Sequence, residues 1–390
     1  MASYKYLIIG AGMTADAAVR GIRELDADGA IGLIGSDHNP PYNRPPLTKG
    51  LWKGKSLDSI WRGTPKFSAD LHLGRTVRSI DPGKKLVRDD QGKEYHYETL
   101  LLATGGTPRR LPFGGEDIIY YRTLDDYHHL RDLSSQFEHF GVIGGGFIGS
   151  EIAAALAMNG KKVSLLFPDA GIGAKIYPKE ISDYLNSFFV QKGVEVLPGE
   201  KVQDLRKVGN RYQLITVDDD AIQVDGVVAG IGIQPNVELA QAAGLKLGNG
   251  IVVDETLHTS QPDIFAAGDV AEFGNPTLGK RMRIEHEDNA NTMGKQAGRN
   301  MAGANEPYHH LSYFYSDLFE LGYEAVGELD SRLETFVDWK EEFKKGVVYY
   351  LANGRVRGVL LWNVWDSVPK ARELIAQPGP FSAVNLKGRL

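Results

Sequence analysis

The chain has 390 residues, of which 42% are hydrophobic and 24% are charged, and its formal net charge at pH 7 is −6. This length is enough for two or three domains with cores of their own, and the acidic balance argues against nucleic acid or an anionic membrane as the main partner. The sequence contains no cysteine, which excludes dithiol relays, thiolate metal sites and cysteine-held iron–sulfur clusters. Any redox chemistry must therefore reside on a bound cofactor.

No segment approaches the roughly 20 consecutive apolar residues of a membrane helix. The N-terminal residues run directly into a strand pattern, which leaves no room for a signal peptide. We therefore expect a cytoplasmic protein that binds neither membrane nor nucleic acid, and we expect no metal site.

A first glycine-rich turn follows an apolar strand pattern at residues 4–9. Gly10, Gly12 and Ala15 stand where a dinucleotide-binding turn needs small residues, and helical apolar spacing follows them. Asp37 comes after the next strand pattern, 27 residues beyond Gly10 (37 − 10). An acid near this spacing can accept a hydrogen bond from a ribose hydroxyl.

Four prolines between residues 40 and 46 predict a stiff loop rather than a regular element. Such a loop can hold Arg44 and Lys49 in fixed positions, although the two cations can equally be solvated on a surface connection. Residues 99–106 then show the pattern of a buried strand that ends in small residues, where backbone can approach a cofactor closely.

The sequence FGVIGGGFIGSE at residues 140–151 contains a second, more complete turn. Gly144 allows the tight turn, Gly146 lets a pyrophosphate approach the backbone, and Gly149 lets the helix pack closely on the strand. The N-terminus of that helix offers free N–H groups to phosphates. Asp169 stands 25 residues after Gly144 (169 − 144), where an acid binds the ribose and repels the 2′-phosphate of NADPH.

Two such turns, each with its strand, helix and acid, predict two bound dinucleotides; packing glycines are the alternative explanation. Glycine and proline at residues 108–115 indicate a crossing between domains, and residues 224–233 are expected to form the last strand before the return. A helix is expected at residues 182–190. Asp269 follows a short apolar strand and either binds a polyol hydroxyl or caps the next helix.

The last part of the chain is expected to contain two helices and a hairpin. A helix is expected at residues 284–301. Two β-branched and aromatic runs, at residues 347–351 and 356–362, are separated by Asn-Gly at 353–354, which predicts a hairpin. A helix is expected at residues 367–376.

Several stretches also carry a family resemblance. They are PYNRPPLTK at 41–49, ATGGTPR at 103–109, IGGGFIGSE at 143–151, IFAAGD at 264–269, RIEHEDNA at 283–290, FYSDL at 314–318 and LLWNVWDSVPKARELI at 360–375. With them the chain resembles FAD-dependent pyridine-nucleotide reductases, in the branch that holds ferredoxin reductases, rubredoxin reductases and apoptosis-inducing factor. The departures are Tyr315 in place of a common Trp, Glu287 in place of an aromatic residue or His, and Ser36 in place of the usual ribose acid.

The resemblance implies an α/β fold with two Rossmann-like dinucleotide-binding domains and a C-terminal β-sheet and helix domain of the α+β type. Residues 1–115 and 238–310 would form a discontinuous FAD domain. The NADH domain, residues 116–237, would be inserted into it, and residues 311–390 would form the interface domain.

The resemblance also implies which residues line each cofactor. The FAD contacts would be Gly10, Gly12, Ala15, Asp37, Arg44, Lys49, Val77, Thr104, Gly105, Arg109, Asp269, His286 and Tyr315. The NADH contacts would be Gly144, Gly146, Phe147, Ile148, Gly149, Asp169, Lys175, Gly232, Glu285 and Glu324. Phe147 near the nicotinamide, and Lys49 paired with Glu151 at the flavin edge, would be the catalytic residues. The alternative is that Lys49 and Glu151 form a salt bridge with no redox role.

The leading hypothesis is an FAD-containing, NADH-dependent oxidoreductase that passes electrons to a small iron–sulfur protein such as ferredoxin or rubredoxin. The alternatives are an enzyme like apoptosis-inducing factor that reduces a quinone, a small radical or oxygen, and a redox-gated binding protein. We expect a monomer or a homodimer. An acidic partner would dock on basic residues, although scattered helix charges are more often merely solvated. The candidates are Lys280, Arg281, Arg283, Lys295 and Arg299.

Overall fold

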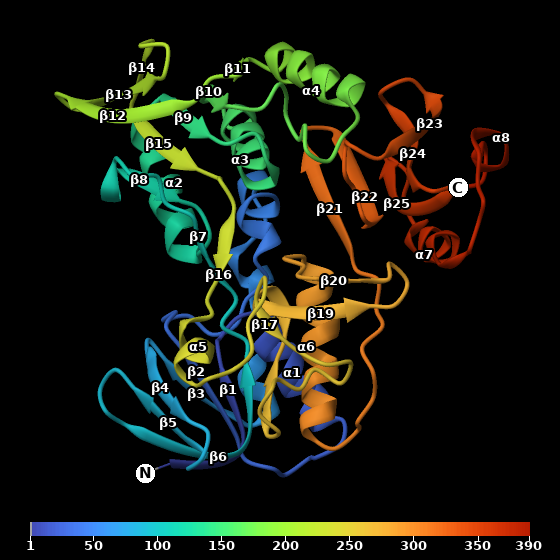
Figure 1. Ribbon diagram of the computed structural model, residues 1–390. Coiled ribbons are helices and arrows are strands. Elements are labelled where there is room, and N and C mark those ends of the chain that lie inside the picture. The colour runs from blue at the N-terminus through green and yellow to red at the C-terminus, as the bar shows by residue number, and fades with distance from the viewer. Residues whose placement is uncertain (1) are drawn as a thin grey trace. The chain divides into compact units, whose positions relative to one another are not determined.

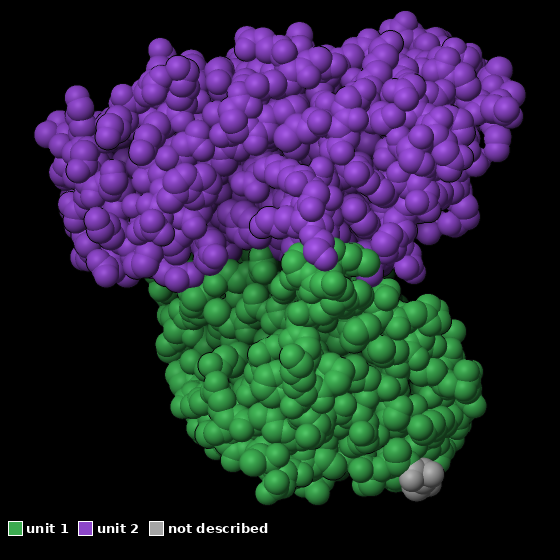
Figure 2. Space-filling model, turned by 180° about the vertical axis from the view of Figure 1, so that it is seen from behind, with its two compact units in different colours: residues 1–43, 57–107, 234–312 green, residues 44–56, 108–233, 313–390 purple. Residues whose placement is uncertain are grey.

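The computed structural model describes residues 2–390 and divides into two compact units, which Figure 2 colours separately (Figures 1 and 2). Unit 1 holds the chain up to residue 43, residues 57–107 and residues 234–312. Unit 2 holds residues 44–56, 108–233 and 313–390. Both units are therefore built from separate stretches of chain. The domain boundaries expected from the sequence remain a prediction.

Unit 1 is organised on a sheet with the strand order β3-β2-β1-β6-β5-β4, to which β18 adds beside β6. The strands are β1 (Ala2–Ile9), β2 (Ile31–Gly35), β3 (Ala69–Leu73), β4 (Val77–Asp81), β5 (Leu86–Asp89), β6 (Glu94–Leu102) and β18 (Ile264–Ala266). The central pairs β1–β2 and β1–β6 are parallel. Successive residues of β1, such as Leu7 and Ile8, have no exposed surface. Burial of successive residues shows that both faces of this strand are covered, as in other parallel sheets.

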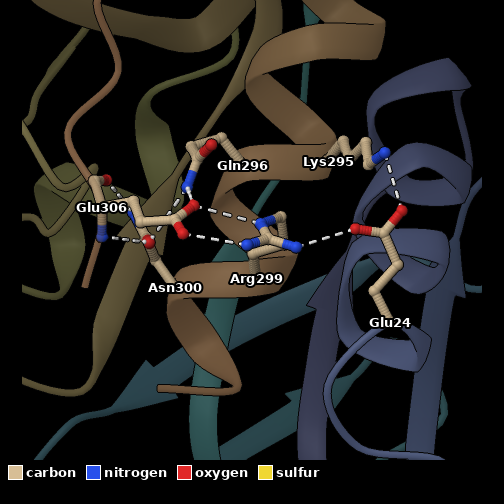
Figure 3. A network of polar contacts seen from close by, with 6 residues as sticks. All are labelled: Glu24, Lys295, Gln296, Arg299, Asn300 and Glu306. Carbon is tan, nitrogen blue, oxygen red and sulfur yellow. Dashed lines mark hydrogen bonds and ion pairs between the residues drawn. The ribbon is translucent and has the colours of Figure 1, made fainter. Parts of the chain in front are cut away.

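Two helices of unit 1, α1 (Met13–Arg23) and α6 (Glu287–Met301), lie side by side (Figure 1). Glycines let them approach, because a Cβ atom on Gly298 would overlap the carbonyl oxygen of Ala18. Figure 3 shows that Glu24, at the end of α1, also forms ion pairs with Lys295 at 2.7 Å and Arg299 at 2.9 Å. These contacts hold the helix that follows the first glycine turn.

The remaining elements of unit 1 are short. They are β17 (Ile251–Val252), β19 (Ala271–Asn275), β20 (Lys280–Met282), α5 (Glu238–Ala242) and the 3-10 turns η3 (Leu57–Ile60), η4 (Thr64–Phe67) and η6 (Gly268–Val270). Two further strands pair with each other where the chain leaves and re-enters unit 1; they are β7 (Gly106–Pro108) and β16 (Ile233–Pro235).

Unit 2 contains a second parallel sheet, with the order β11-β10-β9-β15-β8. Its strands are β8 (Ile118–Tyr120), β9 (His139–Ile143), β10 (Lys162–Phe167), β11 (Val194–Pro198) and β15 (Gly226–Ala229). The helices of this part are α2 (Leu124–Gln136), α3 (Phe147–Met158) and α4 (Lys179–Gln191). A separate antiparallel sheet holds β12 (Val202–Val208), β13 (Arg211–Thr216) and β14 (Ala221–Val224). The turn η5 (Gly115–Asp117) precedes β8.

The C-terminal part of unit 2 is an antiparallel sheet with the order β21-β22-β25-β24-β23. Its strands are β21 (Tyr313–Leu318), β22 (Leu321–Gly327), β23 (Glu334–Glu341), β24 (Lys345–Ala352) and β25 (Arg355–Trp362), followed by α7 (Val368–Ala376) and α8 (Ala383–Leu386). Asn353 and Gly354 both have positive φ, 51° and 70°, as a tight hairpin turn requires. The α/β fold, the hairpin and the helix after it are thus confirmed.

One expectation was wrong, and one of the two alternatives for Asp269 is excluded. The proline-rich segment is not a loop throughout, because it contains the 3-10 turns η1 (Pro45–Leu47) and η2 (Gly50–Lys53); the fixed φ of proline suits the first residues of a helical turn. Asp269 does not cap a following helix. It lies inside the short turn η6, whose N-cap is Ala267.

The remaining helix expectations hold with shifted ends, since the helix expected from residue 284 begins at residue 287. No helix within residues 2–390 combines the length and apolar character that a membrane crossing requires.

The glycine contact between α1 and α6 predicts a stability effect. Gly298→Ala should lower the free energy of unfolding by about 2 kcal/mol, because the added methyl group must push the two helices apart. Urea unfolding of the variant measures this loss. Gly274→Ala is the matched control, since no atom of the described residues lies within 4 Å of a Cβ there. Equal losses in the two variants would contradict the packing argument.

Candidate active site

The second glycine turn lies between β9 and α3. Gly144 has φ +116°, a region that side-chain-bearing residues rarely adopt, and a Cβ on Gly149 would overlap the carbonyl oxygen of Gly144. These two glycines are needed for the turn itself. At Gly146, in contrast, no atom of the described residues beyond its two chain neighbours lies within 4 Å of a Cβ. The space above Gly146, at the N-cap of α3, is therefore open, as a bound pyrophosphate would require.

The first turn is built in a similar way in unit 1. Gly10 has φ +125°, and a Cβ there would overlap the carbonyl oxygen of Ala103. Gly12 is the N-cap of α1, and Ala15 is fully buried in that helix. The chain end of β6 therefore lies directly against the turn. This contact explains why residue 10 must be glycine.

Small and polar groups beyond β6 are fixed by local bonds. The Thr104 hydroxyl donates to the carbonyl oxygen of Asn236 at 2.8 Å, and Gly105 has φ +63°.

After β2, the Asp37 carboxylate accepts from the Asn39 backbone amide at 2.9 Å and from the Tyr42 hydroxyl at 3.1 Å. The Asn39 side-chain amide also donates to Asp37 Oδ1, at 3.1 Å, so Oδ2 keeps one lone-pair site for a ribose hydroxyl.

Three further residues expected at FAD have defined places in unit 1. Val77 is buried at the start of β4. Asp269 lies in η6, and His286 is the N-cap of α6. Burial lowers the pKa of His286 to about 4, although the charges of Asp269 and Asp288 act in the opposite direction. The ring is therefore neutral at neutral pH.

The expected pair of Lys49 and Glu151 is present, and both residues belong to unit 2. The Lys49 Nζ atom lies 2.7 Å from Glu151 Oε2, and the side chains are only 12% and 4% exposed. Lys49 Nζ also lies 5.2 Å from the centre of the Tyr315 ring. A buried ion pair is stable only with further hydrogen bonds.

Two residues that the sequence did not point to supply those bonds. The Thr48 hydroxyl donates to Glu151 Oε2 at 2.5 Å, and the Ser316 hydroxyl donates to Glu151 Oε1 at 2.5 Å. Thr48 precedes Lys49 directly, and Ser316 follows Tyr315 on β21. Thr48 and Ser316 each stand next to a residue that was expected at the site. Nothing in the sequence spacing indicated that both hydroxyls would bind the same carboxylate.

Phe147 packs on β21 of unit 2, and Glu324 belongs to the neighbouring strand β22. Phe147 begins α3, is 37% exposed and packs against Phe314 with ring centres 5.1 Å apart. Glu324 on β22 lies opposite Tyr315 on β21. Its Oε2 atom is buried and has no hydrogen-bond partner among residues 2–390. Burial, and then the charge of Asp366, raise the pKa of Glu324. A buried acceptor without a donor suits a ligand that brings one.

The remaining residues expected at NADH are partly brought together. The Lys175 Nζ atom lies 3.5 Å from Asp169 Oδ2, beyond the end of β10, and its side chain is 81% exposed. Gly232 has φ +90° and accepts from the Arg109 amide at 2.9 Å, so Arg109, expected at FAD, touches a residue expected at NADH.

Three further residues were expected to contact a cofactor. Ile148 is exposed next to Phe147. Glu285 pairs with Arg283 at 2.7 Å. Arg44 is the N-cap of η1.

Most of the basic residues considered for docking an acidic partner are already paired within unit 1. Arg281 binds Glu272, and Arg283 binds Glu285. Arg299 binds Glu24 and Glu306, as Figure 3 shows. These cations are largely neutralised, so they offer little net charge to a partner.

Comparison with known proteins decides the family. Residues 4–294 match the family described as pyridine nucleotide-disulphide oxidoreductase. The chain belongs to this family. Residues 297–340 and 337–377 match the C-terminal region described for mitochondrion-associated apoptosis-inducing factor. The family resemblance seen in the sequence is thus confirmed, and the chain is an FAD-dependent NADH oxidoreductase.

Individual relatives agree with this assignment. The chain is 33% identical to apoptosis-inducing factor 1, mitochondrial, of Dictyostelium discoideum, over 98% of this chain and 80% of the relative. It is 32% identical to the ferredoxin–NAD(+) reductase component of the anthranilate 1,2-dioxygenase system of Burkholderia cepacia, over 96% and 95%. The solved covalent putidaredoxin reductase–putidaredoxin complex matches with TM-score 0.91 and 29% identity, over 99% of this chain and 96% of that chain.

Asp169 should decide the choice of coenzyme. Asp169→Ala should lower the ratio of kcat/KM for NADH over NADPH at least about tenfold, because the carboxylate no longer repels a 2′-phosphate and Lys175 becomes available to bind it. Steady-state kinetics with both coenzymes measure the ratio. Asp183→Ala is the control, because Asp183 pairs with Lys179 on the surface of α4. Unchanged selectivity in Asp169→Ala would refute the role in ribose binding.

Glu324 predicts a dependence of stability on pH. Its pKa is raised above the ordinary 4.5, so the ionised side chain costs folding free energy at neutral pH and nothing below pH 4.5, where both states are protonated. Glu324→Gln should raise the melting temperature of the cofactor-free protein by roughly 2 °C at pH 7, and this gain should vanish near pH 4. Glu334→Gln, at an exposed position of β23, should show neither effect. A gain that is equal at both pH values would contradict the assignment.

Proposed function

We propose that the chain takes hydride from NADH onto FAD and passes the electrons to a small iron–sulfur protein. One observation carries the proposal: the buried Lys49–Glu151 pair lies one helical turn from Phe147. Phe147 and Glu151 are four residues apart on α3, so their side chains share a face of the helix. A buried cation therefore stands close to the residue expected at the nicotinamide.

The residues of unit 2 fit a bound NADH. The open space at Gly146 and the N-terminus of α3 would hold the pyrophosphate, and Asp169 would accept from the adenosine ribose. The buried Glu324 Oε2 atom would accept a hydrogen bond from the nicotinamide carboxamide, and Phe147 would cover the ring. Such positioning supplies much of the rate of a transfer that needs no side-chain acid or base.

The residues of unit 1 fit FAD. The tight turn at Gly10, the N-terminus of α1 and the oriented Asp37 carboxylate would hold its adenosine diphosphate part. Bound FAD would supply hydride acceptance and release of single electrons, which suits a one-electron acceptor. The resemblance to ferredoxin reductases implies Lys49 as a residue at the flavin, where an ammonium group would favour the electron-rich reduced ring.

The names of two relatives support the choice of acceptor. The Burkholderia relative is a ferredoxin–NAD(+) reductase component, and the matching structure is a reductase bound to putidaredoxin. A second candidate is direct reduction of a quinone, a small radical or oxygen, favoured by the C-terminal match to apoptosis-inducing factor. A cytoplasmic location and a monomeric or homodimeric state complete the proposal.

The acceptor can be identified by turnover. With NADH as donor, the purified, FAD-loaded protein should reduce a [2Fe–2S] ferredoxin with kcat/KM at least about tenfold above that for a quinone or for oxygen, because a one-electron acceptor matches single-electron release. Anaerobic NADH oxidation with each acceptor measures this. A quinone rate equal to the ferredoxin rate would favour the second candidate. Slow turnover with every acceptor and a persistent long-wavelength absorption band would instead indicate a redox-gated binding protein.

A further inference from the structure

The carboxylate of Glu151 is bonded on both of its oxygens. Oε2 accepts from the Lys49 ammonium at 2.7 Å and from the Thr48 hydroxyl at 2.5 Å, and Oε1 accepts from the Ser316 hydroxyl at 2.5 Å. The side chain of Glu151 is 4% exposed, so bulk water cannot replace a lost donor. Each hydroxyl therefore replaces a solvent contact that burial has removed.

The two hydroxyls are themselves held by the backbone. Thr48 is the C-cap of η1, where its amide donates to the carbonyl oxygen of Pro45 at 3.3 Å. Ser316 is buried in the middle of β21 and lies opposite Tyr323 in the ladder with β22. A 3-10 turn and a strand thus approach the carboxylate on α3 from different parts of the chain. Rotation of the carboxylate would break a bond to one of them.

We infer that Thr48 and Ser316 are positioning residues that fix the Glu151 carboxylate, and through it the Lys49 ammonium beside the Tyr315 ring. With both hydroxyls in place, Glu151 has one orientation, and the Lys49 Nζ atom keeps its place 5.2 Å from the ring centre. Without them the carboxylate can turn and the ammonium can move with it. The inference rests on the proposed function, in which this cation stabilises reduced FAD.

A purely structural role for the hydroxyls predicts something different. Removing a buried donor always costs stability, whatever the partner does. Only a positioning role also changes how strongly the site favours reduced FAD, since this depends on where the charge of Lys49 stands. The midpoint potential of bound FAD therefore separates the two roles.

The experiment compares four variants of the FAD-loaded protein by spectroelectrochemical titration. Thr48→Val keeps the shape of the side chain and removes the hydroxyl, and Ser316→Ala removes the other hydroxyl. Thr48→Ser retains a hydroxyl at position 48. Ser182→Ala removes a buried hydroxyl on α4 that donates to the carbonyl oxygen of Ile172 at 2.6 Å, far from Glu151 in the hydrogen-bond network.

We expect Thr48→Val and Ser316→Ala each to shift the equilibrium toward oxidised FAD by about tenfold, which corresponds to about 30 mV for a two-electron couple. Thr48→Ser and Ser182→Ala should keep the wild-type potential. Melting temperatures of the cofactor-free variants should fall for Ser182→Ala as well as for Ser316→Ala, since both lose one buried hydrogen bond. The fall should be larger for Ser316→Ala, because its hydroxyl donates to a charged carboxylate.

Two results would overturn the inference. The first is a wild-type potential in both Thr48→Val and Ser316→Ala; the second is a shift in Thr48→Ser as large as that in Thr48→Val. Failure of the proposed function looks different, because the wild-type protein would then bind no FAD or would not be reduced by NADH. If one of the two hydroxyl-free variants does not fold, the other decides the question.

Discussion

A carboxylate that is removed from water organises the candidate active site. Glu151 sits on the helix that begins at the second glycine turn, and burial of its charge is tolerable only because three donors surround it. This requirement ties the helix to η1 and to β21. The same geometry fixes Lys49, so the need to satisfy one buried charge also determines where the main cation of the site stands.

Local sequence patterns correctly predicted the geometry of the second glycine turn. Gly144, Gly149 and Gly146 predicted a tight turn, a close helix and a space for phosphate, and the structure has a positive φ at Gly144, a blocked Cβ position at Gly149 and an open Cβ position at Gly146. These features depend on backbone geometry within a few residues. The hairpin at Asn353 was predictable for the same reason.

Features that depend on distant contacts could not be predicted from local patterns. Thr48 and Ser316 are separated from Glu151 by 103 and 165 residues, and a serine or threonine hydroxyl has no periodicity that would indicate its partner. The pairing of Lys49 with Glu151 was expected only from family resemblance. Asp269 was ambiguous in the sequence, because an acid after a short strand suits a helix cap as well as a ligand contact. Most of the basic residues considered for docking proved to be neutralised by nearby acids.

The interleaved course of the chain has a consequence for biosynthesis. Unit 2 takes its pieces from residues 44–56, 108–233 and 313–390, so α3 leaves the ribosome long before Ser316 on β21 is made. Until then the Glu151 side chain lacks one of its donors and favours an open, hydrated arrangement. The nascent chain therefore cannot complete this part of its core until most of the chain has been made, and closure of the unit becomes a late event that joins segments over a large sequence separation.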